Sequence, residues 1–192
     1  MRPATGKDRP IVETVLLEPG ETFVGTDRPK ILEDGEGPAR RVRITKTLEI
    51  DVHECTNEDF ATFVAATAYE TDSERFGWSF VFHLELDAAA RAGATKAVKG
   101  VEWWLPVNGS DWRSPQGPGS DVFAAKRGAH PVVQVSWHDA AAYCAWRGEK
   151  DGGAPYRVLT EGEHHMLFSA PSQEAREAWI KHIHAHLGLP PV

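Results

Sequence analysis

The sequence contains little that points to a membrane, to nucleic acid or to a disulfide-rich scaffold. Only two residues, Cys55 and Cys144, are cysteines, which is too few for a disulfide framework or a metal-binding motif. No run of about 18 apolar residues is present, so we predict no membrane-spanning segment. The formal net charge is −7, so we expect no nucleic-acid partner.

The first ten or so residues also lack the apolar core of a secretion signal. We interpret residues 1–12 as a flexible arm. If Met1 is the natural start, we expect a cytoplasmic protein. If a signal is missing from this sequence, we expect the endoplasmic reticulum or secretion instead.

Tryptophan, glycine and proline are well represented. The 7 Trp, 17 Gly and 13 Pro residues are typical of a fold with many turns and loops held by large aromatic side chains. A chain of 192 residues buries about 70% of the surface that it exposes when unfolded, so it can form a core without disulfides. We predict one main domain over residues 13–168, followed by a tail over residues 169–192 that contains an amphipathic helix.

Short strands are predicted in the N-terminal part. Val12–Leu17 is an apolar run, Pro19–Gly20 is a turn signal, and Thr22–Gly25 is interpreted as the returning strand of a hairpin. Arg41–Thr45 alternates between polar and apolar residues, the period of a half-buried strand, and Leu48–Val52 is expected to continue that sheet. Further along, the sequence predicts another strand at Ser79–His83 and a helix within residues 87–98.

Three helix starts share one local pattern. The segments Thr56–Asp59, Ser136–Asp139 and Thr160–Glu163 each place a hydroxyl at the N-cap and a carboxylate three residues later, which is a capping box. We expect the first helix to bury Phe60 and Phe63. In the second helix we expect both Trp137 and Trp146 to be packing residues.

Several ordered segments resemble the formylglycine-generating enzyme, or sulfatase-modifying factor, family. They are Pro19–Gly20 with Phe23 and Gly25–Asp27, Asp34–Val42, Glu54–Phe60, Glu74–Gly77, Ser79–Phe82, Trp103–Val107, Asp111–Pro118, His130–Ala140, Tyr143–Cys144 and Tyr156–Glu163. The resemblance covers about residues 13–168 and corresponds to the N-terminal half of the family's domain. After the third capping box, the sequence Glu163–Met166 departs from the family pattern.

The resemblance implies an α+β fold, a partial version of the C-type-lectin-like sulfatase-modifying-factor fold with little regular secondary structure. It also implies a parent activity, the oxidation of a sulfatase cysteine in a Cys-x-Pro-x-Arg motif to formylglycine, with O2 and copper(I) held by thiolates. The implied partner is a sulfatase peptide or protein. Among the residues that match, Trp103, Ser79 and Phe80 are candidates for substrate binding, and the alternative is that they pack in the core.

The number of cysteines limits whether this chain can carry out that oxidation. Copper(I) is a soft ion that prefers thiolate ligands, and a linear site needs two of them close together. The family's two active thiols lie in a C-terminal region to which nothing in this sequence corresponds. We therefore predict no catalytic residue, no metal site and no cofactor in this chain, and a non-catalytic or truncated member of the family. The alternative is an active copper-dependent oxidoreductase that another chain or a missing C-terminal half completes.

Overall fold

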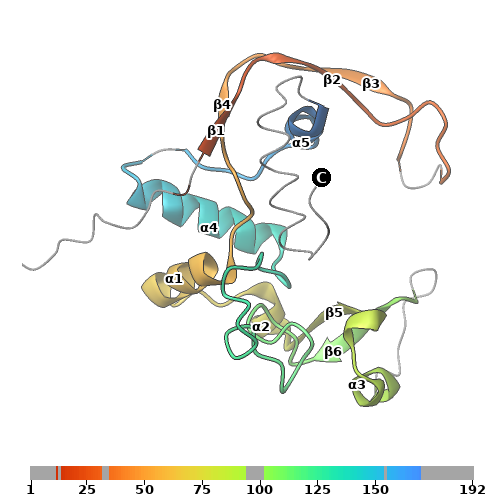
Figure 1. Ribbon diagram of the computed structural model, residues 1–192, viewed down its shortest axis with the longest axis vertical. Helices are drawn as coiled ribbons and strands as arrows, with labels where there is room; N and C mark the ends of the chain where they lie inside the picture. Colours follow the sequence, from red (N-terminus) through yellow and green to blue (C-terminus); the bar gives the residue numbers. More distant parts are fainter. Residues whose placement is uncertain (1–11, 13, 32–34, 94–101, 154, 170–192) are drawn as a thin grey trace, which may run out of the picture. The chain divides into compact units, whose positions relative to one another are not determined.

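The computed structural model describes residues 12, 14–31, 35–93, 102–153 and 155–169. These residues fold into two compact units. The first combines the N-terminal part up to His53 with the part that begins at Leu159, and the second spans Glu54–Val158. Both units are mixed α/β with short helices and two-stranded sheets (Figure 1). This division does not test the domain boundaries expected from the sequence, which stay predictions.

The strands of the first unit form one long interrupted hairpin. β1 (Thr14–Leu17) pairs with β4 (Leu48–Asp51), and β2 (Gly20–Val24) pairs with β3 (Arg40–Ile44), all antiparallel. The predicted hairpin between the first two strands is therefore wrong, and so is the expectation that the fourth strand continues the sheet of the third. The physical reason is that Pro19 lacks an N–H and interrupts the ladder, while the chain reverses only between β2 and β3.

A short helix covers one face of this hairpin. α5 (Glu161–Ser169) packs against β2 and β3, and Met166 joins Leu17 and Ile50 in a small buried core. A Cβ at Gly162 would lie only 2.7 Å from Val42, so the residue without a side chain allows the close approach. Met166, in the segment that departs from the family pattern, therefore serves the core of this unit.

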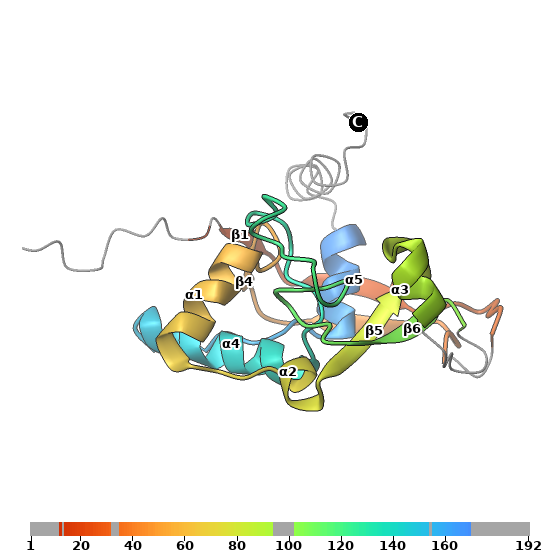
Figure 2. The same ribbon diagram turned by 90° about the horizontal axis from the view of Figure 1, so that it is seen from below.

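Two capped helices form the main core of the second unit. α1 (Asn57–Thr67) and α4 (Trp137–Lys150) lie side by side in Figures 1 and 2 and begin at the predicted N-caps, each with a complete capping box. The predicted box at Thr160 is confirmed as well, since its backbone N–H donates to Glu163 over 2.8 Å. Four aromatic residues fill the space between the helices and the loop that follows β6: Phe60, Phe63, Trp112 and Tyr143.

The two tryptophans of α4 differ in their surroundings. Trp146 packs against the aromatic core and contacts Phe63 at 5.5 Å between ring centroids, as expected. Trp137 is 68% exposed, so the prediction that it packs in the core is wrong. Trp137 is the first residue of the helix, and buried Asp139, Tyr143 and Arg147 occupy the inward face instead.

A strand pair with two short helices completes the second unit. α2 (Asp72–Phe76) leads into β5 (Trp78–Phe82), which pairs with β6 (Trp104–Asn108). The turn η2 (His83–Glu85) and α3 (Ala88–Gly93) follow β5, and Figures 1 and 2 show α3 beside the strand pair. Val81, Leu86 and Leu105 form the small core between them. The strand predicted at residues 79–83 is confirmed with a shift of one residue, and the predicted helix within residues 87–98 is confirmed up to Gly93.

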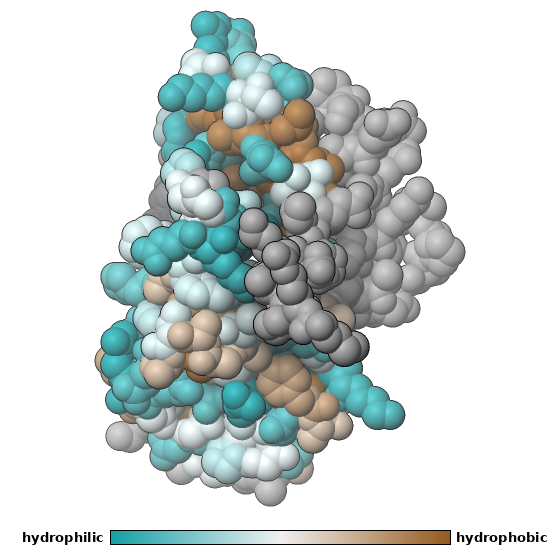
Figure 3. Space-filling view, turned by 90° about the vertical axis from the view of Figure 1, so that its left-hand side faces the viewer, coloured by the Kyte–Doolittle hydropathy of each residue, from teal (hydrophilic) through white to brown (hydrophobic). Residues whose placement is uncertain are grey.

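Other predictions fall on parts that the structure does not cover. The arm over residues 1–12 lies outside the described residues except for Val12, and the amphipathic helix of the tail lies entirely outside them. None of the described helices combines the length and the apolar character that crossing a bilayer requires. Figure 3 shows one face of the molecule, on which hydrophobic residues form separate patches among hydrophilic ones.

Candidate functional site

A groove of about 660 Å³ opens on the surface of the second unit. Its walls come from α2, β5, β6 and the segment that leads into α4. The lining residues are Asp72, Ser73, Phe76, Trp78, Ser79, Phe80, Trp104, Gln134, Val135 and Ser136. Mostly apolar walls with a few directional polar groups are typical of ligand-binding sites, so this groove is the candidate site.

The aromatic wall of the groove is built by strand alternation. Trp78 and Phe80 are two positions apart on β5, so they project from the same face, and their rings meet edge to face with centroids 5.0 Å apart. On β6, Trp104 lies opposite Phe82 and contacts it at 5.6 Å between centroids. Trp78 and Phe80 are each 37% exposed. These rings therefore offer apolar surface to a ligand while the contacts among them limit their motion.

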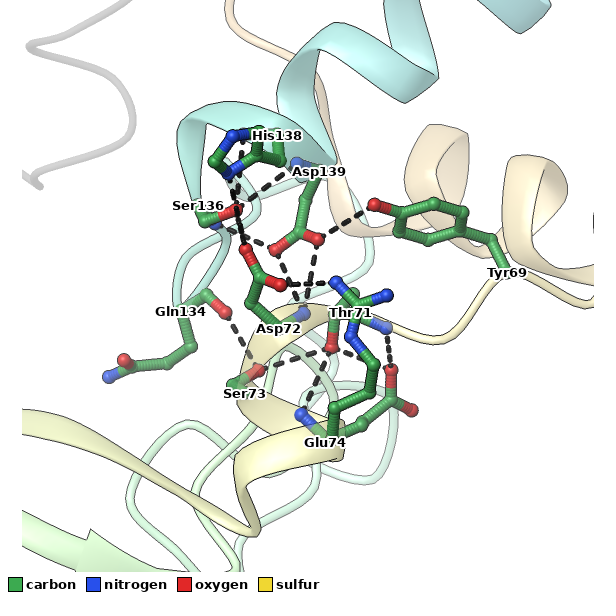
Figure 4. Close-up of polar contacts among 10 residues, drawn as sticks. Tyr69, Thr71, Asp72, Ser73, Glu74, Gln134, Ser136, His138 and Asp139 are labelled. Atoms are coloured by element: carbon green, nitrogen blue, oxygen red, sulfur yellow. Dashed lines mark hydrogen bonds and ion pairs between the residues drawn. The ribbon is translucent and has the colours of Figure 1, made fainter.

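Gln134 closes another part of the wall and contacts three separate segments. Its backbone carbonyl accepts a hydrogen bond from the Ser73 hydroxyl at 3.0 Å, which Figure 4 shows. Its side-chain oxygen accepts from the Ser79 hydroxyl at 2.6 Å, and its side-chain nitrogen donates to the carbonyl of Pro115 at 3.2 Å. The backbone of Gln134 has a φ of 60°, in the left-handed region that non-glycine residues seldom adopt.

Asp72 supplies a negative charge to the groove. The Ser136 hydroxyl donates to its carboxylate, and the Arg75 guanidinium pairs with it (Figure 4). These two contacts, the hydrogen bond from Ser136 first, lower the pKa of Asp72 below its usual range, so the carboxylate is ionised at neutral pH. His138 lies 3.6 Å from the same carboxylate. The Asp72 side chain is 19% exposed, which leaves part of it accessible to a ligand.

A second carboxylate holds the elements around Asp72 in place. Asp139 is fully buried and accepts hydrogen bonds from the Tyr69 hydroxyl at 3.0 Å and from the backbone N–H groups of Asp72 at 3.1 Å and Ser136 at 2.7 Å. Figure 4 shows these bonds converging on one side chain. Asp139 thus ties the start of α4 to the start of α2, and both starts line the groove.

The sequence-predicted binding residues lie at different places relative to this groove. Ser79 and Phe80 line it, whereas Trp103 is not among its lining residues. Trp103 is 46% exposed and its backbone carbonyl accepts from the His83 N–H, while the next residue, Trp104, lines the groove. A role of Trp103, Ser79 and Phe80 in substrate binding stays a prediction.

Among the residues that line the groove, the sequence predicted only Ser79 and Phe80, and the residues that it missed include Asp72, Trp78 and Gln134. Asp72 follows Thr71, whose hydroxyl and backbone N–H form a fourth capping box with Glu74, a pattern that was readable in the sequence. Gln134 carries no comparable local signal, because its partners are 55 and 19 positions away along the chain.

Cys55 and Cys144 are not joined in a disulfide, and each is half-buried. Cys55 immediately precedes the N-cap of α1 and packs against the aromatic core, where its thiol contacts the carbonyl of Thr56 at 3.7 Å. Burial raises the pKa of the Cys55 thiol from 9.0 to about 12, although a hydrogen bond with Tyr143 acts in the opposite direction. Cys55 is therefore a protonated thiol at neutral pH.

Burial of Cys55 disfavours its use as a copper(I) ligand. Such a site needs two adjacent thiolates, and with only two cysteines in the sequence Cys55 would have to be one of them. Its raised pKa opposes the deprotonation that metal binding requires. Within the described ranges, His, Cys, Asp and Glu side chains do not gather into a group of three that could hold a metal ion.

Comparison with known proteins identifies relatives of this chain. Residues 2–185 match the family model of the sulfatase-modifying factor enzyme 1-like domain. The chain is 44% identical over 145 residues to the formylglycine-generating enzyme of Bos taurus, a match that covers 76% of this chain and 38% of the bovine protein. With the formylglycine-generating enzyme of Thermomonospora curvata it shares 42% identity over 171 residues, which cover 88% of this chain and 53% of that protein.

A relative whose name states inactivity has a similar sequence identity to this chain. The chain is 46% identical over 139 residues to the inactive C-alpha-formylglycine-generating enzyme 2 of Bos taurus, covering 72% of this chain and 45% of that protein. The chain thus spans between 38% and 53% of the length of these three relatives. Sequence similarity alone therefore does not separate an active from an inactive member.

Proposed function

This chain belongs to the family of sulfatase-modifying factor enzyme 1-like domains, and we propose that it binds a sulfatase peptide in the groove of its second unit. The observation that carries the proposal is the composition of the groove, in which exposed aromatic rings stand next to one ionised carboxylate. The finer fold assignment, a C-type-lectin-like arrangement, is part of the same proposal.

The proposed ligand has the chemistry of the Cys-x-Pro-x-Arg motif that the family resemblance implies. The proline ring is apolar and suits the surface of Trp78, Phe80 and Trp104. The arginine suits the carboxylate of Asp72, because a guanidinium and a carboxylate form charge-assisted hydrogen bonds. Arg75 already pairs with Asp72, so an incoming arginine shares this carboxylate with it.

We further propose that the chain by itself binds this peptide without oxidising it. The support is the state of Cys55, a half-buried, protonated thiol that packs against the aromatic core and does not line the groove. Formylglycine formation needs an activated thiol next to the substrate cysteine. In this proposal the chain acts as a binding module. The second candidate is an oxidase completed by thiols from another chain, and it is motivated by the similarity to relatives named formylglycine-generating enzyme.

One experiment tests binding and chemistry together. The purified chain is titrated with a synthetic Cys-x-Pro-x-Arg peptide, and binding is followed by calorimetry, with a peptide in which alanine replaces the proline and the arginine as the control. The same mixture then receives copper(I) and O2. Mass spectrometry detects conversion of the thiol to an aldehyde as a loss of about 18 Da.

We expect the motif peptide to bind more tightly than the control peptide and its mass to stay unchanged. A mass loss with the chain alone would overturn the binding-module proposal and make the chain an oxidase. Equal affinity for the two peptides would overturn the proposal that the groove recognises the motif. Two variants test the site. Phe80→Ala, inside the groove, should weaken binding of the motif peptide, and Leu84→Ala, at an exposed apolar residue outside the groove, should leave it unchanged.

A further inference from the structure

Gln134 occupies an unfavourable backbone conformation at the wall of the groove. Its φ of 60° lies in the left-handed region, where a side chain with a Cβ is strained. In this conformation Gln134 accepts hydrogen bonds from the Ser73 hydroxyl on its carbonyl and from the Ser79 hydroxyl on its side-chain oxygen, and its side-chain nitrogen donates to Pro115. A strained residue that lines a groove and is held on both its backbone and its side chain is a candidate for a positioning role.

The partners of Gln134 determine the direction of every hydrogen bond in this group. A carbonyl only accepts, so the contact with the oxygen of Pro115 requires the amide nitrogen of Gln134 on that side. The amide oxygen of Gln134 then faces Ser79, and an amide oxygen also only accepts. The hydroxyl of Ser79 must therefore donate its single hydrogen to Gln134.

The hydrogen bond to Gln134 changes what the Ser79 hydroxyl can offer to a ligand in the groove. With its hydrogen committed to Gln134 at 2.6 Å, this oxygen presents only lone pairs to a molecule in the groove. A serine hydroxyl without such a partner rotates and serves equally as donor or acceptor. Gln134 removes that freedom.

We infer that Gln134 is a positioning residue that makes Ser79 an obligatory hydrogen-bond acceptor, so that the groove selects a peptide with a free backbone N–H over Ser79. The inference rests on the proposed function, because it specifies which group of the bound peptide the groove recognises, namely one backbone N–H. Gln134 acts through Ser79, and Ser79 is the residue that contacts the peptide.

The test compares the binding of one peptide with that of its N-methylated analogues. A Cys-x-Pro-x-Arg peptide is prepared with a single N-methyl group at each backbone N–H in turn, which removes one donor at a time; the proline has no N–H and is left unchanged. Kd values for the full chain are measured by calorimetry. For the wild type we expect one position at which N-methylation weakens binding by about tenfold, because the Ser79 oxygen is then left without its donor.

Two variants connect that selectivity with Gln134. Ser79→Ala removes the acceptor, so the same N-methyl group should then weaken binding by no more than about twofold. Gln134→Asn keeps a residue that tolerates the left-handed region, but its side chain is one methylene shorter and does not span from Ser79 to Pro115. We expect Gln134→Asn also to lose the selectivity for the N–H donor.

The matched control is Lys126→Asn. Lys126 has a φ of 58°, so this variant also places an asparagine in the left-handed region, and Lys126 lies outside the lining of the groove. We expect it to keep the tenfold selectivity. A purely structural role of Gln134 would change the affinity for all peptides by one factor and leave the ratio between them unchanged.

The outcomes separate the two proposals. If the wild type shows the selective position and Gln134→Asn keeps it, the role of Gln134 is refuted while peptide binding stands. If the wild type binds every N-methylated peptide as tightly as the unmodified peptide, the role of Gln134 is also refuted, and peptide binding again stands. If the wild type does not bind the unmodified peptide, the proposed function is refuted and the inference falls with it.

Discussion

The hydroxyl of Tyr69 donates a hydrogen bond to the fully buried carboxylate of Asp139 over 3.0 Å, although 70 positions separate the two residues in the sequence. The same carboxylate accepts from the backbone N–H groups of Asp72 and Ser136. One side chain therefore joins the end of α1, the start of α2 and the start of α4. The groove depends on that junction, because Asp72 and Ser136 line it.

Replacement of Asp139 should be strongly destabilising. Asp139→Ala leaves the Tyr69 hydroxyl and two backbone N–H groups without their acceptor, so we expect the free energy of unfolding to fall by about 2–4 kcal/mol. Tyr69→Phe removes one of these bonds and should lower it by about 1 kcal/mol. Urea denaturation of both single variants and the double variant measures the coupling. Additive effects would show that the Tyr69–Asp139 bond contributes nothing.

The aromatic core should respond to truncation far more than the surface does. Phe60 is 1% exposed and contacts Phe63 and Trp112 with ring centroids 5.4 and 5.3 Å apart. Phe60→Ala should therefore cost about 3–5 kcal/mol of stability. Leu84, with 66% exposure, is the control, and Leu84→Ala should change stability by about 0.5 kcal/mol or less. Similar melting temperatures for the two variants would contradict the described core.

Stability should fall on the alkaline side because of Cys55. Burial raises the pKa of this thiol to about 12 in the folded chain from an ordinary value of 9.0, so the folded state holds the proton more tightly. This contribution to stability is fully present below pH 9.0 and is lost as the pH rises towards about 12, since unfolding then releases a proton. Burial raises the pKa of Tyr143 as well, which acts in the same direction.

Denaturation curves at several pH values measure this loss. Cys55→Ala removes the thiol and should make the decline of the free energy of unfolding shallower above pH 9.0. Alkylation of native protein at neutral pH provides a second readout, because the protonated thiol of Cys55 should react slowly and the unfolded chain quickly. An unchanged slope in Cys55→Ala, or fast alkylation of Cys55 in the folded chain, would show that the thiol is not protonated and buried as described.

The carboxylate of Asp72 should matter only for ligands that carry a positive charge. Asp72→Asn keeps the shape of the side chain and removes the charge, so we expect about three- to tenfold weaker binding of a Cys-x-Pro-x-Arg peptide. The same variant should bind an analogue with alanine in place of the arginine as well as the wild type does. Glu70→Gln, an exposed carboxylate two positions away and outside the groove lining, is the control. A loss of affinity for both peptides would indicate a structural effect instead.

The local features of the fold were predictable from the sequence. Each capping box links a hydroxyl to the residue three positions later, so Thr56, Ser136 and Thr160 identified their helix starts without knowledge of distant residues. The alternation in β3 and the aromatic residues of α1 were predictable for the same reason, since a strand has a period of two and a helix a period of 3.6. Trp137 shows the limit of this approach, because its exposure depends on what packs against the first turn of α4.

The sequence by itself determined the family and the starts of α1, α4 and α5. Only the tertiary structure decided which strands pair, that Asp139 is buried against Tyr69, and that Gln134 meets both Ser79 and Pro115. The physical reason is the range of the interactions. Capping and periodicity act within one turn or one strand, whereas the groove is formed by hydrogen bonds and ring contacts between residues far apart in the chain, and no local pattern encodes these contacts.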